Sequence, residues 1–169
     1  MREMLWVAGV LALAGCGDEP RATAELMNAA GTKVATVMLV EKDGAVELQL
    51  EATGLDPGTH GIHFHAVGLC EGPAFTSAGA HFNPLEKQHG LESPTGAHAG
   101  DLPNLEVDAS GKATTTMSTN RVRLSEGQLS VFDADGTALV IHARADDQVT
   151  DPSGNSGDRI ACGVLRKSE

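Results

Sequence analysis

The chain has 169 residues, of which 41% are hydrophobic, and its formal net charge at pH 7 is −11. This length suits a single domain that buries a core without needing a metal ion merely to fold. Phosphate recognition needs a basic face, so the acidic balance excludes nucleic acid as an expected partner. We expect most of the charge to serve solubility.

The N-terminus has the pattern of an export signal. A charged start precedes an apolar stretch that is too short to span a bilayer. The sequence Leu-Ala-Gly-Cys at residues 13–16 resembles the lipobox of bacterial lipoproteins, in which the peptide is cut before the cysteine and the cysteine is acylated. A conventional signal peptide with an incidental cysteine is the alternative.

From this pattern we predict three parts of the chain. They are a lipoprotein signal peptide over residues 1–15, a lipidated Cys16 with a polar tether over residues 16–21, and one domain over residues 22–169. The lipid on Cys16 would anchor the mature protein to a membrane of the bacterial cell envelope, on its periplasmic or extracellular face.

Short segments with apolar residues at near-alternate positions predict an antiparallel, all-β domain, a sandwich or a barrel. Three pairs of these segments surround turn sequences that contain Asp and end in Gly, which indicates hairpins. No helical period is convincing. The predicted strands cover residues 22–27, 33–40, 45–50, 61–65, 105–107, 113–117, 129–132, 138–142 and 160–165.

Two stretches, residues 66–103 and 145–158, are too long and irregular to be hairpin turns. Long loops inside a compact domain are usually functional or disordered. The first of them carries Cys70 and four candidate metal ligands, so we expect it to be ordered.

Once Cys16 is assigned to lipid, Cys70 and Cys162 remain as a pair that would form a disulfide in an oxidising compartment. Two buried free thiols are the alternative.

Six of the seven histidines lie between residues 60 and 101, which indicates a metal site. His63 and His65 alternate with Phe64, and the two-residue period of a strand puts both imidazoles on one face. His142 ends a distant apolar segment and could return to the cluster. The loop supplies donors whose spacing suits a closed tetrahedral zinc site: His81, His89, His98 and Asp101.

Six segments carry a family resemblance: residues 58–65, 76–84, 89–90, 98–104, 140–147 and 157–164. They closely resemble the copper-zinc superoxide dismutases, in their bacterial, lipoprotein-type form. The resemblance implies an eight-stranded Greek-key sandwich or barrel, immunoglobulin-like, with long metal-binding and active-site loops. It further implies copper bound by His63, His65, His81 and His142, and zinc bound by His81, His89, His98 and Asp101, with His81 bridging both.

The same resemblance assigns roles around the metals. Asp146 would link His63 to His89 through their outer nitrogens. Arg159 would stand beside the open copper position, where a fixed cation attracts a small anion. Cys70 and Cys162 match the family's intrasubunit disulfide, and His60 matches a structural hydrogen-bonding residue, not a ligand. The chain departs from animal enzymes in its shorter, lysine-free loop at 145–158, which puts electrostatic steering in doubt.

The sequence therefore predicts an exported enzyme that converts superoxide to dioxygen and hydrogen peroxide at copper. A module that carries or buffers copper without turnover is one alternative, and an adhesion sandwich with incidental histidines is another. Subunit contacts differ between branches of the family, so the oligomeric state stays open, with a homodimer as one candidate.

Overall fold

The computed structural model describes residues 19–168, so the predicted signal peptide and Cys16 lie outside the described residues. The described part is all-β, as predicted, with one short 3-10 turn and no α-helix. This part of the chain contains no helix that is long and apolar enough to cross a membrane. The elements are β1 (Arg21–Asn28), β2 (Lys33–Lys42), β3 (Ala45–Thr53), β4 (Gly58–His60), β5 (Ile62–His65), η1 (Thr76–Ala78), β6 (Leu105–Val107), β7 (Lys112–Thr119), β8 (Ala138–His142), β9 (Arg159–Val164) and β10 (Arg166–Ser168).

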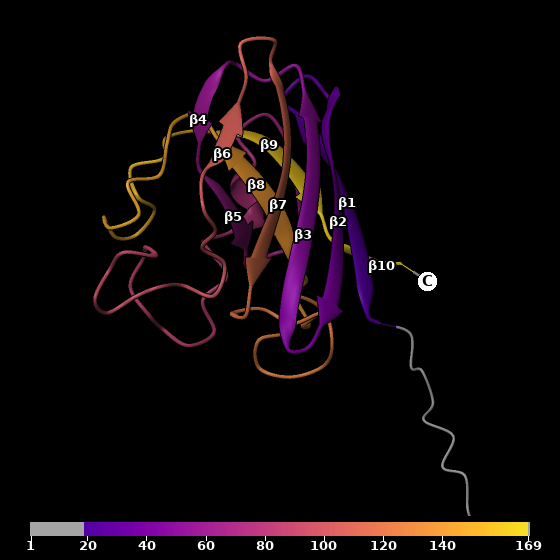
Figure 1. Ribbon diagram of the computed structural model, residues 1–169, viewed down its shortest axis with the longest axis vertical. Coiled ribbons are helices and arrows are strands. Elements are labelled where there is room, and N and C mark those ends of the chain that lie inside the picture. Colours follow the sequence, from indigo (N-terminus) through magenta and orange to yellow (C-terminus); the bar gives the residue numbers. More distant parts are fainter. Residues whose placement is uncertain (1–18, 169) are drawn as a thin grey trace, which may run out of the picture.

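The strands form a curled antiparallel sheet (Figure 1). Its order is β5-β8-β9-β1-β2-β3-β7, β10 adds to β1, and β4 pairs separately with β6. β3 and β7 are neighbours in space although β4, β5 and β6 lie between them in sequence, which is a Greek-key connection. β5 and β8 are likewise paired across a long stretch of chain.

Alternation along the strands builds the core. In β3 the burial pattern alternates almost without interruption, with Val46, Leu48 and Leu50 facing inward. Burying one such side chain is worth about 1.5–3 kcal/mol. Phe64, between the two β5 histidines, is fully buried in the same core. Strand β5 therefore gives its apolar ring to the core, while its two imidazoles remain for a site on the other face.

The predicted hairpins form to different degrees. Asp43 and Gly44 both have positive φ, as a two-residue turn between β2 and β3 requires, and the two strands pair without a break from the turn to Ala35 and Ala52. The turn at Asp108 also forms, with Gly111 N donating to Asp108 O at 3.0 Å. However, β6 pairs with β4 and β7 with β3, so this turn is a corner between the two sheets.

One predicted strand is wrong. Residues 129–132 make only an isolated bridge, between Ser130 and Arg123, and do not pair with β8. The Ser130 hydroxyl accepts the N–H of Phe132 at 3.2 Å, and the Asp133 carboxylate accepts that of Asp135. Such local side-chain bonds compete with strand pairing. Both sides of β8 are already occupied, by β5 and β9.

The predicted strand at 61–65 begins earlier and is divided at Gly61. β4 pairs with β6 and β5 with β8, so Gly61 stands where the chain changes partner. A Cβ here would lie 2.9 Å from that of Ser156, which explains the glycine.

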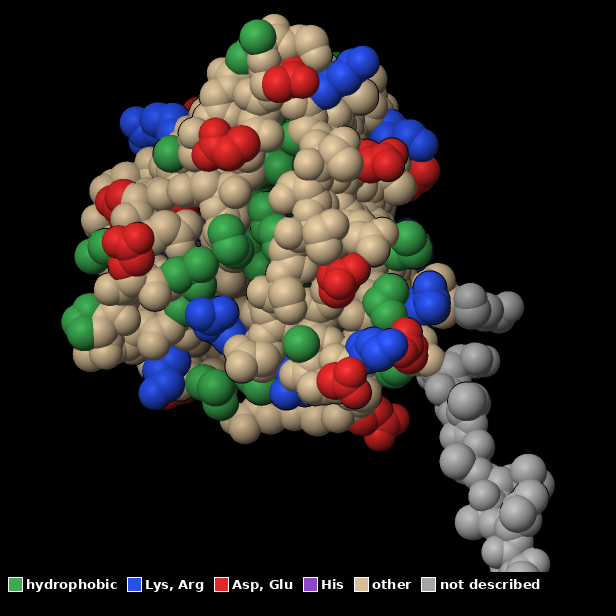
Figure 2. Space-filling view, in the orientation of Figure 1, with side chains coloured by type: hydrophobic (Ala, Val, Ile, Leu, Met, Phe, Trp, Pro, Cys, Tyr) green, Lys and Arg blue, Asp and Glu red, His purple; other side chains and the backbone are tan. Residues whose placement is uncertain are grey.

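The long loops extend to one side of the sheet, at the left of Figure 1. Figure 2 shows acidic and basic side chains interspersed over one face.

Candidate metal centre

Four imidazoles gather where β5 meets β8. His63 and His65 lie on β5, His142 ends β8, and an isolated β-bridge to His65 holds His81 beside them. The ring centroids of His63 and His81 are 4.0 Å apart, and the Nε2 atoms of His65 and His142 are 3.4 Å apart. One nitrogen from each ring lies within 4.8 Å of the others, so this four-histidine cluster could hold a metal ion.

A second cluster surrounds a buried carboxylate. Oδ1 of Asp101 lies 3.0 Å from Nδ1 of His81, 3.0 Å from Nδ1 of His89 and 3.4 Å from Nδ1 of His98. Oδ2 accepts the backbone N–H groups of Gly90 and His98, each at 2.9 Å, which fixes the carboxylate. Three imidazoles with one carboxylate are a donor set typical of a tetrahedral zinc site. We call this group the carboxylate cluster.

His81 belongs to both clusters. Its Nδ1 faces Asp101 and lies 3.4 Å from Nδ1 of His98, inside the carboxylate cluster. Its Nε2 is buried and has no hydrogen-bond partner among the described residues. The two nitrogens of one imidazole point in opposite directions, so Nε2 is left for the four-histidine cluster. A single ring can thus serve two ions.

The unpartnered atoms test whether metal ions fit. Nδ1 of His63, Nε2 of His81 and Nδ1 of His89 are buried without a hydrogen bond in the described part of the chain. Leaving a buried polar atom unsatisfied costs about 1–3 kcal/mol. All three belong to residues of the two clusters, where a metal ion would satisfy them. The residues present therefore fit two metal ions.

Backbone carbonyls orient two rings of the four-histidine cluster. Nδ1 of His65 contacts the carbonyl oxygen of Gly79 at 2.9 Å, and Nδ1 of His142 contacts that of Gly157 at 3.2 Å. Since a carbonyl only accepts, both Nδ1 atoms carry the proton, and Nε2 of each ring is free to bind metal.

Asp146 orients the outer nitrogens of two further rings. Its Oδ2 lies 2.6 Å from Nε2 of His63, and its Oδ1 lies 3.0 Å from Nε2 of His89. The side chain is fully buried, and two bonds with Asn104 hold its backbone: Asn104 Nδ2 donates to Asp146 O, and Asp146 N donates to Asn104 Oδ1, each at 2.8 Å. One carboxylate thus ties a ring of the four-histidine cluster to a ring of the carboxylate cluster.

Burial keeps three of the donor rings neutral. It lowers the pKa of His65 to about 2, of His142 to about 3 and of His81 to about 4. Burial opposes the charged form of His89 too, but the Asp101 and Asp146 carboxylates, each with an oxygen 3.0 Å from a ring nitrogen, raise its pKa to about 9. Its Nδ1 must therefore lose a proton when a metal ion binds.

Comparison with known proteins identifies the family. The model of the family described as copper/zinc superoxide dismutase matches residues 33–165. This chain belongs to that family. A Cu-Zn superoxide dismutase of Aquifex aeolicus is 43% identical over 95% of this chain and 96% of its own. The superoxide dismutase-like protein YojM of Bacillus subtilis is 41% identical over 96% of this chain and 94% of its own.

Solved structures agree with the sequence relatives. A superoxide dismutase-like protein from Bacillus subtilis superimposes with a TM-score of 0.82 at 43% identity, covering 85% of this chain and 97% of its own. The clock protein EA4 superimposes with a TM-score of 0.74 at 33% identity, covering 90% of this chain and 98% of its own. Copper and zinc are thus the cofactors, as predicted from the sequence, and the two clusters are able to bind them.

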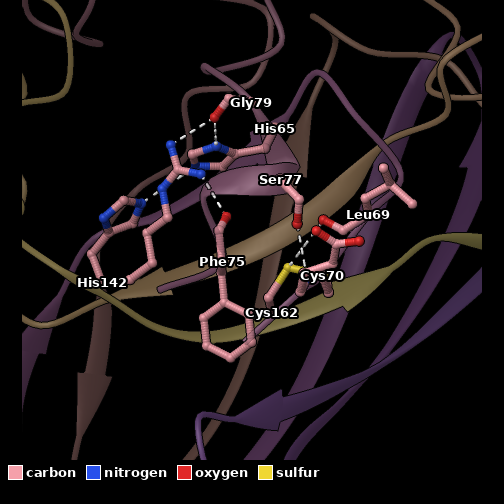
Figure 3. Close-up of a disulfide and its surroundings, with 10 residues drawn as sticks. His65, Leu69, Cys70, Phe75, Ser77, Gly79, His142 and Cys162 are labelled. Atoms are coloured by element: carbon pink, nitrogen blue, oxygen red, sulfur yellow. Dashed lines mark hydrogen bonds between the residues drawn. A yellow bond between two sulfur atoms is a disulfide. The ribbon is translucent and has the colours of Figure 1, made fainter. Parts of the chain in front are cut away.

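In this copper/zinc superoxide dismutase fold, Arg159 lines an open pocket with Gly157 and Asp158. Its Nη1 donates to the carbonyl of Phe75 at 2.7 Å, and its Nη2 to that of Gly79 at 2.6 Å. Gly79 is the residue whose carbonyl also orients His65, as Figure 3 shows. Partial burial lowers the pKa of Arg159, but a guanidinium remains charged.

The predicted disulfide joins Cys70 in the long loop to Cys162 in β9, with Cα atoms 5.6 Å apart (Figure 3). It closes a separation of 92 residues, for which the loop-entropy model gives about 4–5 kcal/mol as an upper figure. Phe75 follows it in the chain and is buried beside it with Ala78. The disulfide thereby pins the segment whose carbonyls hold Arg159.

The structure brings every predicted ligand into one of the two clusters and leaves His60 outside both. The ring nitrogens of His60 instead contact the carbonyls of His142 and Asp56, at 2.7 and 2.9 Å. Sequence reasoning missed the carbonyls of Gly79 and Gly157, which carry no side-chain signal. It also missed Asp151, which accepts the backbone N–H of His89 at 2.7 Å.

Proposed function

We propose that this chain is a superoxide dismutase that holds copper in the four-histidine cluster and zinc in the carboxylate cluster. The observation that carries the proposal is the shared imidazole of His81, which offers one nitrogen to each cluster. An all-nitrogen set suits copper, which binds nitrogen sites most tightly of the divalent first-row ions, and three imidazoles with a carboxylate suit zinc. Superoxide is the substrate that family membership supports.

Copper supplies the redox chemistry when bound, since it cycles between two oxidation states, whereas zinc does not. Two superoxide ions and two protons then give one dioxygen and one hydrogen peroxide. The chain's own contribution includes a proton site, because Nε2 of His81 can take up a proton when it is not bound to metal. Its Nδ1 stays in the carboxylate cluster, so the ring keeps its place while it holds that proton.

Arg159 binds and orients the anionic substrate in this proposal. Its side chain is held by two carbonyls and lines the open pocket, so a positive charge stands at a fixed place. A fixed cation attracts a small anion without having to be ordered at each encounter.

Superoxide consumption measured on protein loaded with copper and zinc tests the function. We expect turnover only after copper loading, and we expect copper to be lost from His63→Ala while the fold is retained. Loaded protein that binds both metals without consuming superoxide would favour a copper-carrying module instead.

We further propose that the protein is exported and anchored through lipid on Cys16. The apolar stretch and the Leu-Ala-Gly-Cys sequence at residues 13–16 support this location. A source of superoxide outside the cytoplasm would then meet the enzyme at the cell envelope.

A further inference from the structure

The outer nitrogens of the clustered histidines single out one ring. Those of His63, His65, His89 and His142 each lie within 3.2 Å of an oxygen. The outer nitrogen of His98, Nε2, has no acceptor at hydrogen-bond distance among the described residues. A histidine that binds metal through Nδ1 carries its proton on Nε2 and almost always donates it.

One carboxylate faces that nitrogen. Oδ1 of Asp151 lies 3.8 Å from Nε2 of His98, and the same oxygen accepts the backbone N–H of His89 at 2.7 Å. His98 is buried, whereas the Asp151 side chain is half exposed, so the contact lies at the rim of the carboxylate cluster. Asp151 belongs to the second long loop and its two partners to the first.

We propose that Asp151 is a positioning residue for the zinc half of the site, serving two of its three imidazoles through one carboxylate oxygen. It fixes the backbone of His89 and places a carboxylate oxygen 3.8 Å from the outer nitrogen of His98. The inference rests on the proposed assignment of zinc to the carboxylate cluster. In this proposal Asp146 links the two clusters, and Asp151 links the second long loop to two zinc ligands.

A carboxylate that accepts a backbone N–H also orders its loop, so an effect of Asp151 on zinc must be separated from an effect on loop order alone. Asp147 provides the comparison. It lies in the same loop and accepts the N–H groups of Val149 and Thr150 and the amide of Asn155, but the structure gives it no contact with a clustered histidine. A loss of zinc affinity caused by loop order alone should appear in the variants of both aspartates.

The test uses the full domain with copper held constant and measures two quantities. Zinc affinity is measured by competition with a chromophoric chelator, and the visible spectrum is recorded with cobalt(II) in place of zinc. We expect Asp151→Ala to weaken zinc binding about tenfold to a hundredfold, the range for outer partners of metal ligands, and to change the cobalt spectrum. Asp151→Asn keeps an acceptor for His89 N–H without the charge, so we expect an intermediate loss. Asp147→Asn should match the parent.

Three outcomes overturn the proposal: unchanged affinity in Asp151→Ala, unchanged cobalt spectra in both Asp151 variants, or an equal loss in Asp147→Asn. His98→Ala separates this inference from the zinc assignment. If His98→Ala leaves zinc bound, the assignment itself is wrong. If His98→Ala releases zinc and Asp151→Ala does not, only the role of Asp151 fails.

Discussion

Arg159 combines a fixed position with a charge opposite to that of the whole chain. Two backbone carbonyls hold its guanidinium, and one of them, that of Gly79, also orients His65. The net charge of −11 should repel superoxide, but the Debye length at physiological salt is about 8 Å, so distant carboxylates are largely screened. The local cation should therefore dominate the encounter.

Reversing this charge should slow the reaction. We predict that Arg159→Glu lowers the second-order rate at low ionic strength by at least about tenfold, within the range of electrostatic focusing. Added salt should raise or preserve the rate of the variant, whereas the parent should show a less positive salt dependence. Arg166→Glu on β10 changes the total charge equally, so it serves as the control in stopped-flow or pulse-radiolysis measurements. Equal rates and salt profiles for the two variants would show that Arg159 does not guide the substrate.

At the scale of elements, the metal site depends on how closely the two long loops approach. Gly154 has a φ of 61°, and a Cβ there would overlap Oδ1 of Asp146 and lie 2.7 Å from Nε2 of His89. The loop can therefore cover the Asp146 bridge only with glycine at this place. Gly31, in the turn between β1 and β2, has a φ of 75° and open space around it.

These two glycines give a matched pair. We predict that Gly31→Ala costs about 1–2 kcal/mol of stability from the left-handed backbone alone. Gly154→Ala should cost more, and it should also release zinc, because Asp146 must move away from His89. Chemical unfolding and metal analysis of the purified variants measure both effects. Equal losses of stability with full metal content in both variants would mean that this close approach is not needed.

Sequence patterns predicted where the strands lie better than which strands pair or which groups hydrogen-bond to the histidines. Alternation located β1, β2, β3 and β7, since each buries one face, and a family resemblance located the clustered side chains. The error at residues 129–132 and the division at Gly61 both concern pairing, which depends on strands far away in sequence. The acceptors of His65 and His142 are backbone carbonyls, so no residue type marks them.

At the scale of the molecule, the start of β1 and the two long loops lie on different sides of the domain. Figure 1 shows the start of β1 at the lower right and both long loops at the left. The described chain therefore begins on the side of the domain away from the loops that carry metal ligands. Anchoring is therefore compatible with free access of a diffusing anion.

Cys16→Ser tests the anchor. We predict that this change converts a membrane-bound product into one that is soluble or unprocessed, because a polar tether has no apolar area to bury in lipid. Fractionation of cells after expression measures it. The only tryptophan is Trp6 and the chain has no tyrosine, so the processed protein should absorb almost nothing at 280 nm. Membrane retention of a processed serine variant would contradict lipidation.

The shared imidazole is the central claim, and metal analysis of His81→Ala tests it most directly. The parent should bind one copper and one zinc per chain, and His81→Ala should weaken both, because Nε2 and Nδ1 serve different clusters. Asp101→Ala should weaken zinc first, since its carboxylate belongs to one cluster only. Titration of each metal into the apoproteins, with chelator competition, gives the affinities. Loss of both metals from His81→Ala is the predicted result, and unchanged zinc affinity in that variant would contradict the bridge.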